Sequence, residues 1–205
     1  MREVAMLEDL GFRVALLAVL GAGLAVSGAL RRRADRAGGE VPRSADEKPV
    51  RVALVAGAVL FYGALVAWLV HPELVGWGSV PVAEPVRWSG AVLLAAGVAL
   101  ALWALTHLGR NVTPTAVARE DAELVTTGPY ARVRHPLYSS MLLTLPGCAL
   151  LAANLVVLIG GVVTFAAILV RVRREEEELV GRFGERYVAY AERTGRVLPR
   201  LGRSE

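Results

Sequence analysis

The sequence predicts an all-α membrane protein: a polytopic transmembrane helix bundle of about five spans, including a C-terminal helical hairpin, followed by a cytosolic C-terminal helix. Three observations lead to this fold class. Hydrophobic residues make up 55% of the 205 residues. They are gathered in blocks that approach the roughly 20 residues needed to cross a hydrocarbon core. Arginines are concentrated between these blocks, as is typical of cytosolic loops. We therefore expect a single integral membrane domain over residues 1–205.

The N-terminal part, residues 1–108, contains the first three expected spans. Its first apolar block is longer than the core of a signal peptide and is followed by Arg31, Arg32 and Arg33, a stop-transfer pattern. We therefore expect this block to remain as a span. The complete set of predicted spans is about 11–30, 52–70, 88–108, 137–152 and 155–170.

The last two spans come from one apolar stretch, residues 137–170. A single helix of that length would measure about 51 Å, too long for a bilayer without extreme tilt. Pro146 and Gly147 weaken a continuous helix, and the sequence Ala152-Ala153-Asn154 offers a turn. The favoured interpretation is a tight hairpin of two short spans. One long, kinked and tilted helix is the alternative.

The distribution of charge predicts the topology. With five spans, the basic loops 31–51 and 109–136 and the arginine-rich tail after residue 170 all fall on one side. The loop 71–87 has Arg87 as its only arginine or lysine and falls on the other side. The positive-inside rule then places the N-terminus outside and the C-terminus in the cytosol, and we expect the plasma membrane as the location. The same loops account for the net charge of +4, so nucleic acid is not an expected partner.

The tail is predicted to continue as a helix from the fifth span. Leu179, Phe183, Tyr187 and Tyr190 recur at intervals that place them on one helix face. Gly184 interrupts this stripe, which suggests a break or a close approach of two backbones. A solvated helix lying at the membrane interface is the simpler alternative for its charged residues.

Polar residues that are suited to chemistry form a first constellation at residues 128–138, directly before the fourth span. Gly128 and Pro129 form a turn signal, and Pro136 occupies the first turn of the span, where its missing N–H costs nothing. Arg134 and His135 then lie at the mouth of the membrane on the cytosolic side. Membrane anchoring by the arginines, and an interfacial belt of Tyr130 and Tyr138, is the alternative.

A second constellation, residues 171–178, directly follows the fifth span. Four consecutive glutamates follow three arginines, and Arg171 and Glu175 are neighbours one helical turn apart. An ion pair at the edge of a membrane is a candidate functional site. No metal site is predicted, because His71, His107 and His135 lack ligand spacing. The single Cys148 lies in an apolar run and should pack as a small hydrophobe.

The ordered motifs of residues 105–200 resemble the isoprenylcysteine carboxyl methyltransferase and phospholipid methyltransferase superfamily. The combination is specific, whereas each piece alone is weak. The matching pieces are Leu108-Gly109-Arg110-Asn111, Leu124-Val125-Thr126-Thr127-Gly128-Pro129-Tyr130, Arg134-His135-Pro136-x-Tyr138, Glu175-Glu176-x-x-Leu179, Phe183-Gly184-x-x-Tyr187-x-x-Tyr190 and Pro199.

The resemblance implies an integral membrane methyltransferase that uses S-adenosylmethionine and acts on a lipidic or small hydrophobic acceptor, with residues 109–200 as the methyltransferase region. Backbone groups near Leu124 and Val125 would meet the adenine. The catalytic candidates it implies are Arg171, Glu176 and Glu175. The other cofactor-binding candidates are Gly128, Tyr130, Arg134, His135, Pro136, Tyr138, Tyr187 and Tyr190. One departure is Ala122, where the family often has histidine.

Methyl transfer from a sulfonium needs alignment more than acid–base help, so most of the rate should come from positioning. A carboxylate acceptor needs only a cation such as Arg171 to hold it. An amine acceptor would have to lose a proton, with which Glu176 could assist. Asn111 begins a glycosylation sequon, but the predicted topology places it in the cytosol, where it would cap a helix or line the pocket instead.

Two other functions stay open from the sequence. An NADPH-dependent sterol-type membrane reductase shares a similar C-terminal arrangement, including an Arg-His-Pro-x-Tyr element. A non-catalytic membrane protein that retains the pocket is the second. Stabilisation of the purified protein by S-adenosylhomocysteine, by NADPH or by neither separates the three.

Overall fold

The computed structural model describes residues 9–36, 48–109 and 123–200, and the regular structure within these ranges is helical. The long helices are α2 (Leu10–Arg36), α3 (Lys48–Val70), α4 (Glu84–Leu108), α5 (Pro136–Ala152), α6 (Leu155–Phe183) and α7 (Glu185–Arg193). The short 3-10 helices are η1 (Pro72–Leu74), η2 (Gly76–Gly78) and η4 (Gly128–Ala131). Three residues named in the sequence analysis lie outside the described residues: Arg110, Asn111 and Ala122.

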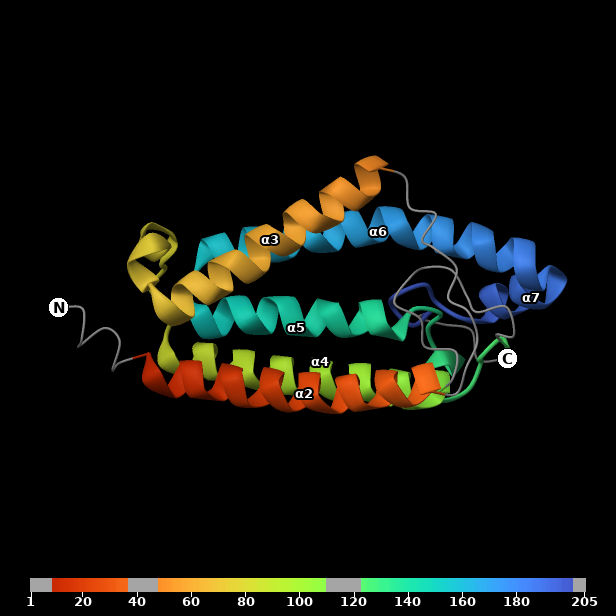
Figure 1. The fold of residues 1–205 in the computed structure, drawn as a ribbon, viewed down its shortest axis with the longest axis horizontal. Coiled ribbons are helices and arrows are strands. Elements are labelled where there is room, and N and C mark those ends of the chain that lie inside the picture. Colours follow the sequence, from red (N-terminus) through yellow and green to blue (C-terminus); the bar gives the residue numbers. More distant parts are fainter. Residues whose placement is uncertain (1–8, 37–47, 110–122, 201–205) are drawn as a thin grey trace.

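Five apolar helices run alongside one another and confirm the all-α bundle (Figure 1). Helices α2, α3, α4 and α6 are long and apolar enough to cross a membrane. Helix α5 is shorter, at 17 residues, and corresponds to about 26 Å, close to the lower limit for a span. In Figure 1 it lies between the pair α2–α4 and the pair α3–α6. The shortest member of the bundle therefore has a pair of helices on each of two sides.

The predicted hairpin is confirmed, and the alternative of one long helix over residues 137–170 is wrong. Helix α5 ends at Ala152, and the next residue, Ala153, adopts a left-handed conformation with φ of 47°. Asn154 then caps α6, because its side-chain oxygen accepts a hydrogen bond from the Val156 N–H at 2.9 Å. Its side-chain amide donates to the Val75 carbonyl at 2.8 Å. The turn is thus held both by its own cap and by the α3–α4 connection.

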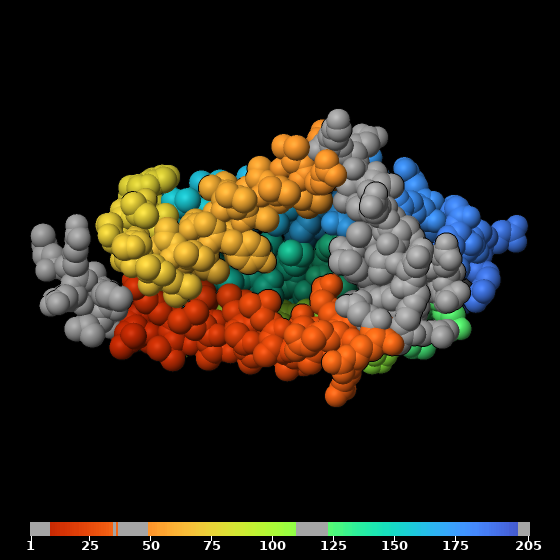
Figure 2. All heavy atoms as spheres, in the orientation of Figure 1, coloured from red at the N-terminus to blue at the C-terminus, as the bar shows by residue number. Residues whose placement is uncertain are grey.

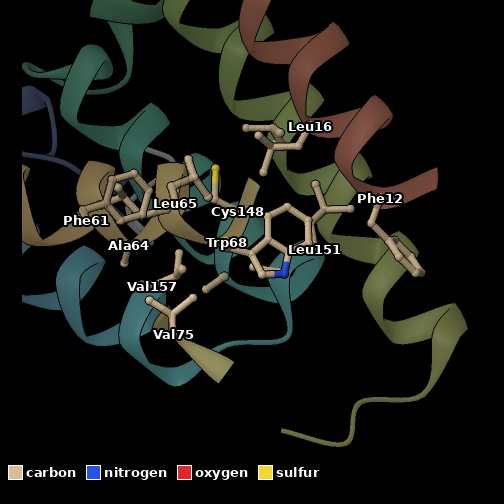
Figure 3. Packing of buried hydrophobic residues seen from close by; sticks show 14 residues of the cluster. Phe12, Leu16, Phe61, Ala64, Leu65, Trp68, Val75, Cys148, Leu151 and Val157 are labelled. Atoms are coloured by element: carbon tan, nitrogen blue, oxygen red, sulfur yellow. The ribbon is translucent and has the colours of Figure 1, made fainter. Parts of the chain in front are cut away.

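The largest apolar core lies at the hairpin end of the bundle (Figure 3). Phe12 and Leu16 from α2 and Trp68 from α3 meet the end of α5 there, around Leu151. Cys148 is buried in the same cluster, with 2% of its surface exposed, and packs as a small hydrophobe as predicted. Rigid packing is therefore concentrated at the end of the bundle away from the two polar constellations.

Small residues allow α4 and α5 to pack backbone to backbone. A Cβ atom at Gly90 would lie 2.7 Å from the Gly147 carbonyl oxygen, and one at Gly147 would lie 2.8 Å from the Gly90 oxygen. Contacts this close are possible only without side chains, and they are typical of membrane helix interfaces. The α4–α5 contact in turn fixes where the first turn of α5 lies.

Replacing Gly90 with alanine should lower the free energy of unfolding by about 1–3 kcal/mol, since the added methyl overpacks the helix interface. Gly63 on α3 is the matched control, because a Cβ there would meet nothing within 4 Å. Its replacement with alanine should leave stability unchanged or slightly raised, because alanine favours the helix. Thermal denaturation in detergent measures both variants. Equal melting temperatures for the two would contradict the close packing of α4 against α5.

The two N-terminal helices leave part of α5 uncovered. Helix α2 packs mainly on α4, and α3 packs mainly on α6. Figure 2 shows a hollow between α2 and α3, with α5 visible at its floor. One face of the bundle is therefore open towards α5 from the side that would meet lipid.

Helix α6 continues beyond its apolar part, as the sequence predicted. Residues 171–183 extend the same helix, which ends at Phe183. Gly184, with φ of 55°, then starts α7 in a new direction. The predicted break in the tyrosine stripe is therefore real. Tyr187 and Tyr190 on α7 are buried, whereas Phe183 is only half-buried.

Candidate active site

The hairpin brings the two polar constellations together. Helices α5 and α6 are antiparallel and joined by a tight turn, so the start of α5 faces the part of α6 that lies equally far from the turn. Pro136 lies as many residues before the end of α5 as Arg171 lies after the start of α6. The motif around His135 and the charged run of α6 therefore meet at one end of the bundle, next to α7 (Figure 1).

Arg134 joins the loop to α6 and α7. Its Nε donates to Glu176 Oε1 at 2.7 Å, and the two side chains are only 10% and 12% exposed. Its Nη1 donates to the Ala191 carbonyl at 2.9 Å and also to the Thr194 carbonyl. The fixed donors of the Arg134 guanidinium thus bind both a buried carboxylate and the end of α7.

His135 lies between the two adjacent carboxylates of α6. Its Nδ1 is 3.5 Å from Glu175 Oε2, and its Nε2 is 3.6 Å from Glu176 Oε1. Its ring stacks on Tyr138 with centroids 5.7 Å apart, and the Tyr138 hydroxyl donates to Glu175 Oε1 at 2.7 Å. The imidazole is 7% exposed, so its position is set by these neighbours.

The predicted pair of Arg171 and Glu175 is confirmed. Arg171 Nε lies 3.4 Å from Glu175 Oε1, one helical turn along α6. The oxygen that receives the Tyr138 hydroxyl therefore also faces Arg171. Six of the candidate site residues form one connected cluster, which we call the charged cluster: Arg134, His135, Tyr138, Arg171, Glu175 and Glu176.

Glu176 stays ionised in this cluster. The residue lies beyond the apolar part of α6, next to the loop residues. Burial alone raises its pKa, but the contacts from Arg134 and Arg196, with His135 close by, lower the pKa overall to about 2. A carboxylate with such a low pKa is a weak proton acceptor at pH 7. Glu176 is therefore suited to holding positive charge in place.

The C-terminal segment 194–197 completes the cluster, and the sequence analysis did not identify it. The Arg134 N–H donates to the Gly195 carbonyl at 2.8 Å, and the His135 N–H donates to the Arg196 carbonyl at 3.0 Å. The Arg196 side chain reaches Glu176 Oε2 with its Nη2 at 2.5 Å. Gly195 is the only sequence signal here. A Cβ at that position would collide with the Leu198 carbonyl.

The tyrosines of α7 pack beneath the loop. The Tyr190 hydroxyl donates to the Tyr130 carbonyl at 2.6 Å, and both rings are buried. Burial raises the pKa of Tyr190 to about 12 and also raises the pKa of Tyr187. The two rings meet edge to face at 5.9 Å. Tyr130 and Tyr190 thus fix loop and helix to each other as neutral side chains.

The start of the loop rests on α4. Gly128 has φ of 60°, and a Cβ there would collide with the ring of His107. Glycine is needed at this position for both reasons. Leu124 and Val125 lie half-buried in the irregular segment before η4, and their contact with an adenine stays a prediction. His107 was not expected here, because spacing alone did not relate it to the loop.

The residues fit a small ligand that carries both charges. His135 Nε2 and Tyr187 Oη are buried and make no hydrogen bond within the described chain. Such polar atoms are costly unless a ligand or water pairs with them. Together with the paired arginines and glutamates, they offer donors and acceptors for an ammonium, a carboxylate and a ribose-like hydroxyl. In the part of the chain that the structure describes, no group of three histidine, cysteine, aspartate or glutamate side chains is placed to hold a metal.

Comparisons with known proteins agree with this architecture. The model of the phospholipid methyltransferase family matches residues 86–186. Protein-S-isoprenylcysteine O-methyltransferase B of Arabidopsis thaliana is 33% identical over 113 residues, which cover 54% of this chain and 57% of that protein. Nickel-cobalt-cadmium resistance protein NccN of Alcaligenes xylosoxydans xylosoxydans is 32% identical over 121 residues, covering 56% and 53%.

A solved structure shares the fold. The eukaryotic intramembrane Ras methyltransferase, isoprenylcysteine carboxyl methyltransferase, aligns with a TM-score of 0.50 at 24% identity, covering 75% of this chain and 53% of that one. The chain spans little more than half the length of NccN and of the Arabidopsis protein.

The fold and the charged cluster define a polytopic helical membrane protein with a polar site at one end of a helical hairpin. The sequence comparisons relate this chain to methyltransferases, and the solved structure shares its helical fold. Residues 86–186 of the chain match the phospholipid methyltransferase family, and the chain is similar to an isoprenylcysteine methyltransferase over about half of its length.

Proposed function

We propose that the protein is a methyltransferase that uses S-adenosylmethionine and modifies a lipidic or small hydrophobic acceptor at the cytosolic membrane face. The observation that carries this proposal is the charged cluster, in which loop 128–138 and the end of α6 meet. Its charged groups lie directly beyond the apolar helices, where a membrane-bound acceptor and a water-soluble donor can meet.

S-adenosylmethionine supplies a methyl group that is activated by its sulfonium. The protein needs to hold the donor and the acceptor in line and exclude water, and positioning of this kind supplies much of a rate enhancement. Tyr130, His135 and Tyr138 would line the donor site, with the backbone near Leu124 and Val125 at the adenine. Arg171 and the adjacent glutamates would face the reacting end.

The electrostatics of Glu176 favour a carboxylate acceptor. With a pKa of about 2, Glu176 is a weak proton acceptor for an ammonium group at pH 7. A carboxylate needs no deprotonation, and Arg171 at the edge of the cluster would hold it by charge. The apolar tail of such an acceptor would lie against α5 in the hollow between α2 and α3 (Figure 2). An isoprenylcysteine-like carboxylate is therefore preferred over a phospholipid amine.

The orientation is part of the proposal. The N-terminus would lie outside and the C-terminus in the cytosol of a cell bounded by this membrane, which we take to be the plasma membrane. The basic end of α2 supports this, since the charged cluster lies at the same end of the bundle as Arg33 and Arg36 in the last turn of α2.

Transfer of labelled methyl from S-adenosylmethionine tests both parts. Membrane vesicles that contain the protein should label a lipid-soluble product, and identification of that product names the acceptor. Because the donor is charged and crosses bilayers slowly, inside-out vesicles should be active without detergent, whereas right-side-out vesicles should require it. Absence of labelled product in permeabilised vesicles of both kinds, supplied with a total membrane lipid extract and an isoprenylcysteine analogue, would reject the function. The opposite sidedness would reject the orientation.

Ligand-dependent stability separates the remaining alternatives. S-adenosylhomocysteine at 100 times its Kd should stabilise the purified protein by about 2.7 kcal/mol. Stabilisation by NADPH alone would favour a sterol-type reductase, and no response to either would favour a non-catalytic protein.

A further inference from the structure

Arg196 is the accessible cation beside Glu176. Its side chain is 46% exposed, compared with 10% for Arg134 and 7% for His135. It contacts Glu176 Oε2, while Arg134 holds the other oxygen. Of the three positively charged or protonatable groups described around this carboxylate, only Arg196 can exchange its partner without bringing a buried side chain to the surface.

The Arg134 side chain has further partners in the protein. Besides Glu176, it binds the Ala191 and Thr194 carbonyls at the end of α7. Movement of Arg134 would leave a buried carboxylate and two carbonyls with fewer partners, which is costly. It is therefore a fixed part of the framework.

The backbone of Arg196 is held while its side chain is exposed. The Arg196 carbonyl accepts the His135 N–H at 3.0 Å, and the flanking Val197 carbonyl accepts the Ser139 hydroxyl at 2.6 Å. The guanidinium can therefore swing about a fixed point next to Glu176. A cation with this freedom is suited to receive the anionic group of a ligand.

An amino-acid zwitterion fits this pair without a change in net charge. If the Glu176–Arg196 contact opens, an ammonium can replace Arg196 beside Glu176, and a carboxylate can pair with the freed guanidinium. One ion pair is exchanged for two, so the buried Glu176 carboxylate is not left without a cation, which would be strongly unfavourable. A carboxylate acceptor alone would lack the ammonium needed for Glu176.

We propose that Arg196 is a specificity-determining residue that binds the carboxylate of the amino-acid end of the methyl donor, with Glu176 binding the ammonium. This rests on the proposed function, because it takes S-adenosylmethionine as the donor. The C-terminal segment thereby becomes part of the donor site.

Binding of two nucleosides tests the assignment. S-adenosylhomocysteine carries the amino-acid end, whereas 5′-methylthioadenosine lacks it. Replacing Arg196 with alanine should weaken S-adenosylhomocysteine binding by roughly 10- to 100-fold, as expected for a lost charged hydrogen bond. The Kd of methylthioadenosine should not change. Arg193→Ala is the matched control, since Arg193 is exposed and, among the described residues, donates to the Ala189 carbonyl of its own helix.

The other outcomes are distinct. Equal weakening of both nucleosides would show that Arg196 only supports the fold, and unchanged binding of both would also overturn the assignment. If the substitution changed only the KM of the acceptor, Arg196 would bind the carboxylate of the acceptor, and its role at the donor would be rejected. If the wild-type protein bound neither nucleoside, the proposed function would fail and this assignment with it. Thermal denaturation of Arg196→Ala and Arg196→Lys confirms that the variants are folded.

Discussion

Replacing Arg134 with alanine should lower the free energy of unfolding by about 3 kcal/mol, because it removes the main partner of a buried carboxylate. Of its described partners, Glu176 would keep the exposed Arg196 and the longer contact to His135. The Ala191 and Thr194 carbonyls would also lose their shared donor. The same change should therefore release α7 from the loop.

Thermal denaturation in mild detergent measures the loss of stability, and limited proteolysis after α7 reports its release. Lysine should not restore either property, since one ammonium cannot reproduce the fixed fork of donors that meets a carboxylate and two carbonyls. Arg173→Ala on the exposed face of α6 is the control and should melt like the wild type. A wild-type melting temperature for Arg134→Ala would show that this network does not stabilise the protein.

Loss of Arg171 or His135 should reduce kcat/KM for methyl transfer by roughly 10²- to 10³-fold while the protein remains folded. This magnitude is typical when one preorganised charged or polar group is removed from an active site. Arg171 faces Glu175 at 3.4 Å, and His135 lies between both glutamates. Each would act by orienting the reacting groups.

The measurement is steady-state methyl transfer alongside thermal denaturation. Because His135 is buried, His135→Asn is a second variant that keeps a polar side chain of similar size. Arg186→Ala, at an exposed position on α7, should retain wild-type turnover. Wild-type turnover in both Arg171→Ala and His135→Asn would remove the proposed site from the charged cluster.

The α5–α6 hairpin could be predicted from the sequence. The length of the apolar stretch argued against one helix, and the positive-inside rule independently favoured the hairpin. The structure confirms the turn and adds its mechanism, the cap and cross-link formed by Asn154. That mechanism was hidden because the partner of the side chain, Val75, is remote in the sequence.

The charged cluster was also foreseen in part. Local motifs identified His135 and Glu176 as candidates, and the predicted hairpin implied that they share one end of the bundle. The role of Arg196 was not foreseen, because its neighbours are reached through backbone pairing of Arg134 and His135 with the C-terminal segment. No hydrophobic periodicity marks a contact of so few residues. His107 against Gly128 was missed for the same reason.

The membrane class of this protein, its helices and the residue types at its polar end could be predicted from the chain alone. They follow from local composition, because burial in lipid demands long apolar helices and excludes unpaired charge. The pairing of those charges is visible only in the folded molecule: Arg134 with Glu176 and α7, His135 between two glutamates, and Arg196 at the exposed edge. Such choices depend on distances of a few ångströms between segments that are far apart in the chain, and Coulomb energies and hydrogen bonds change steeply over that range.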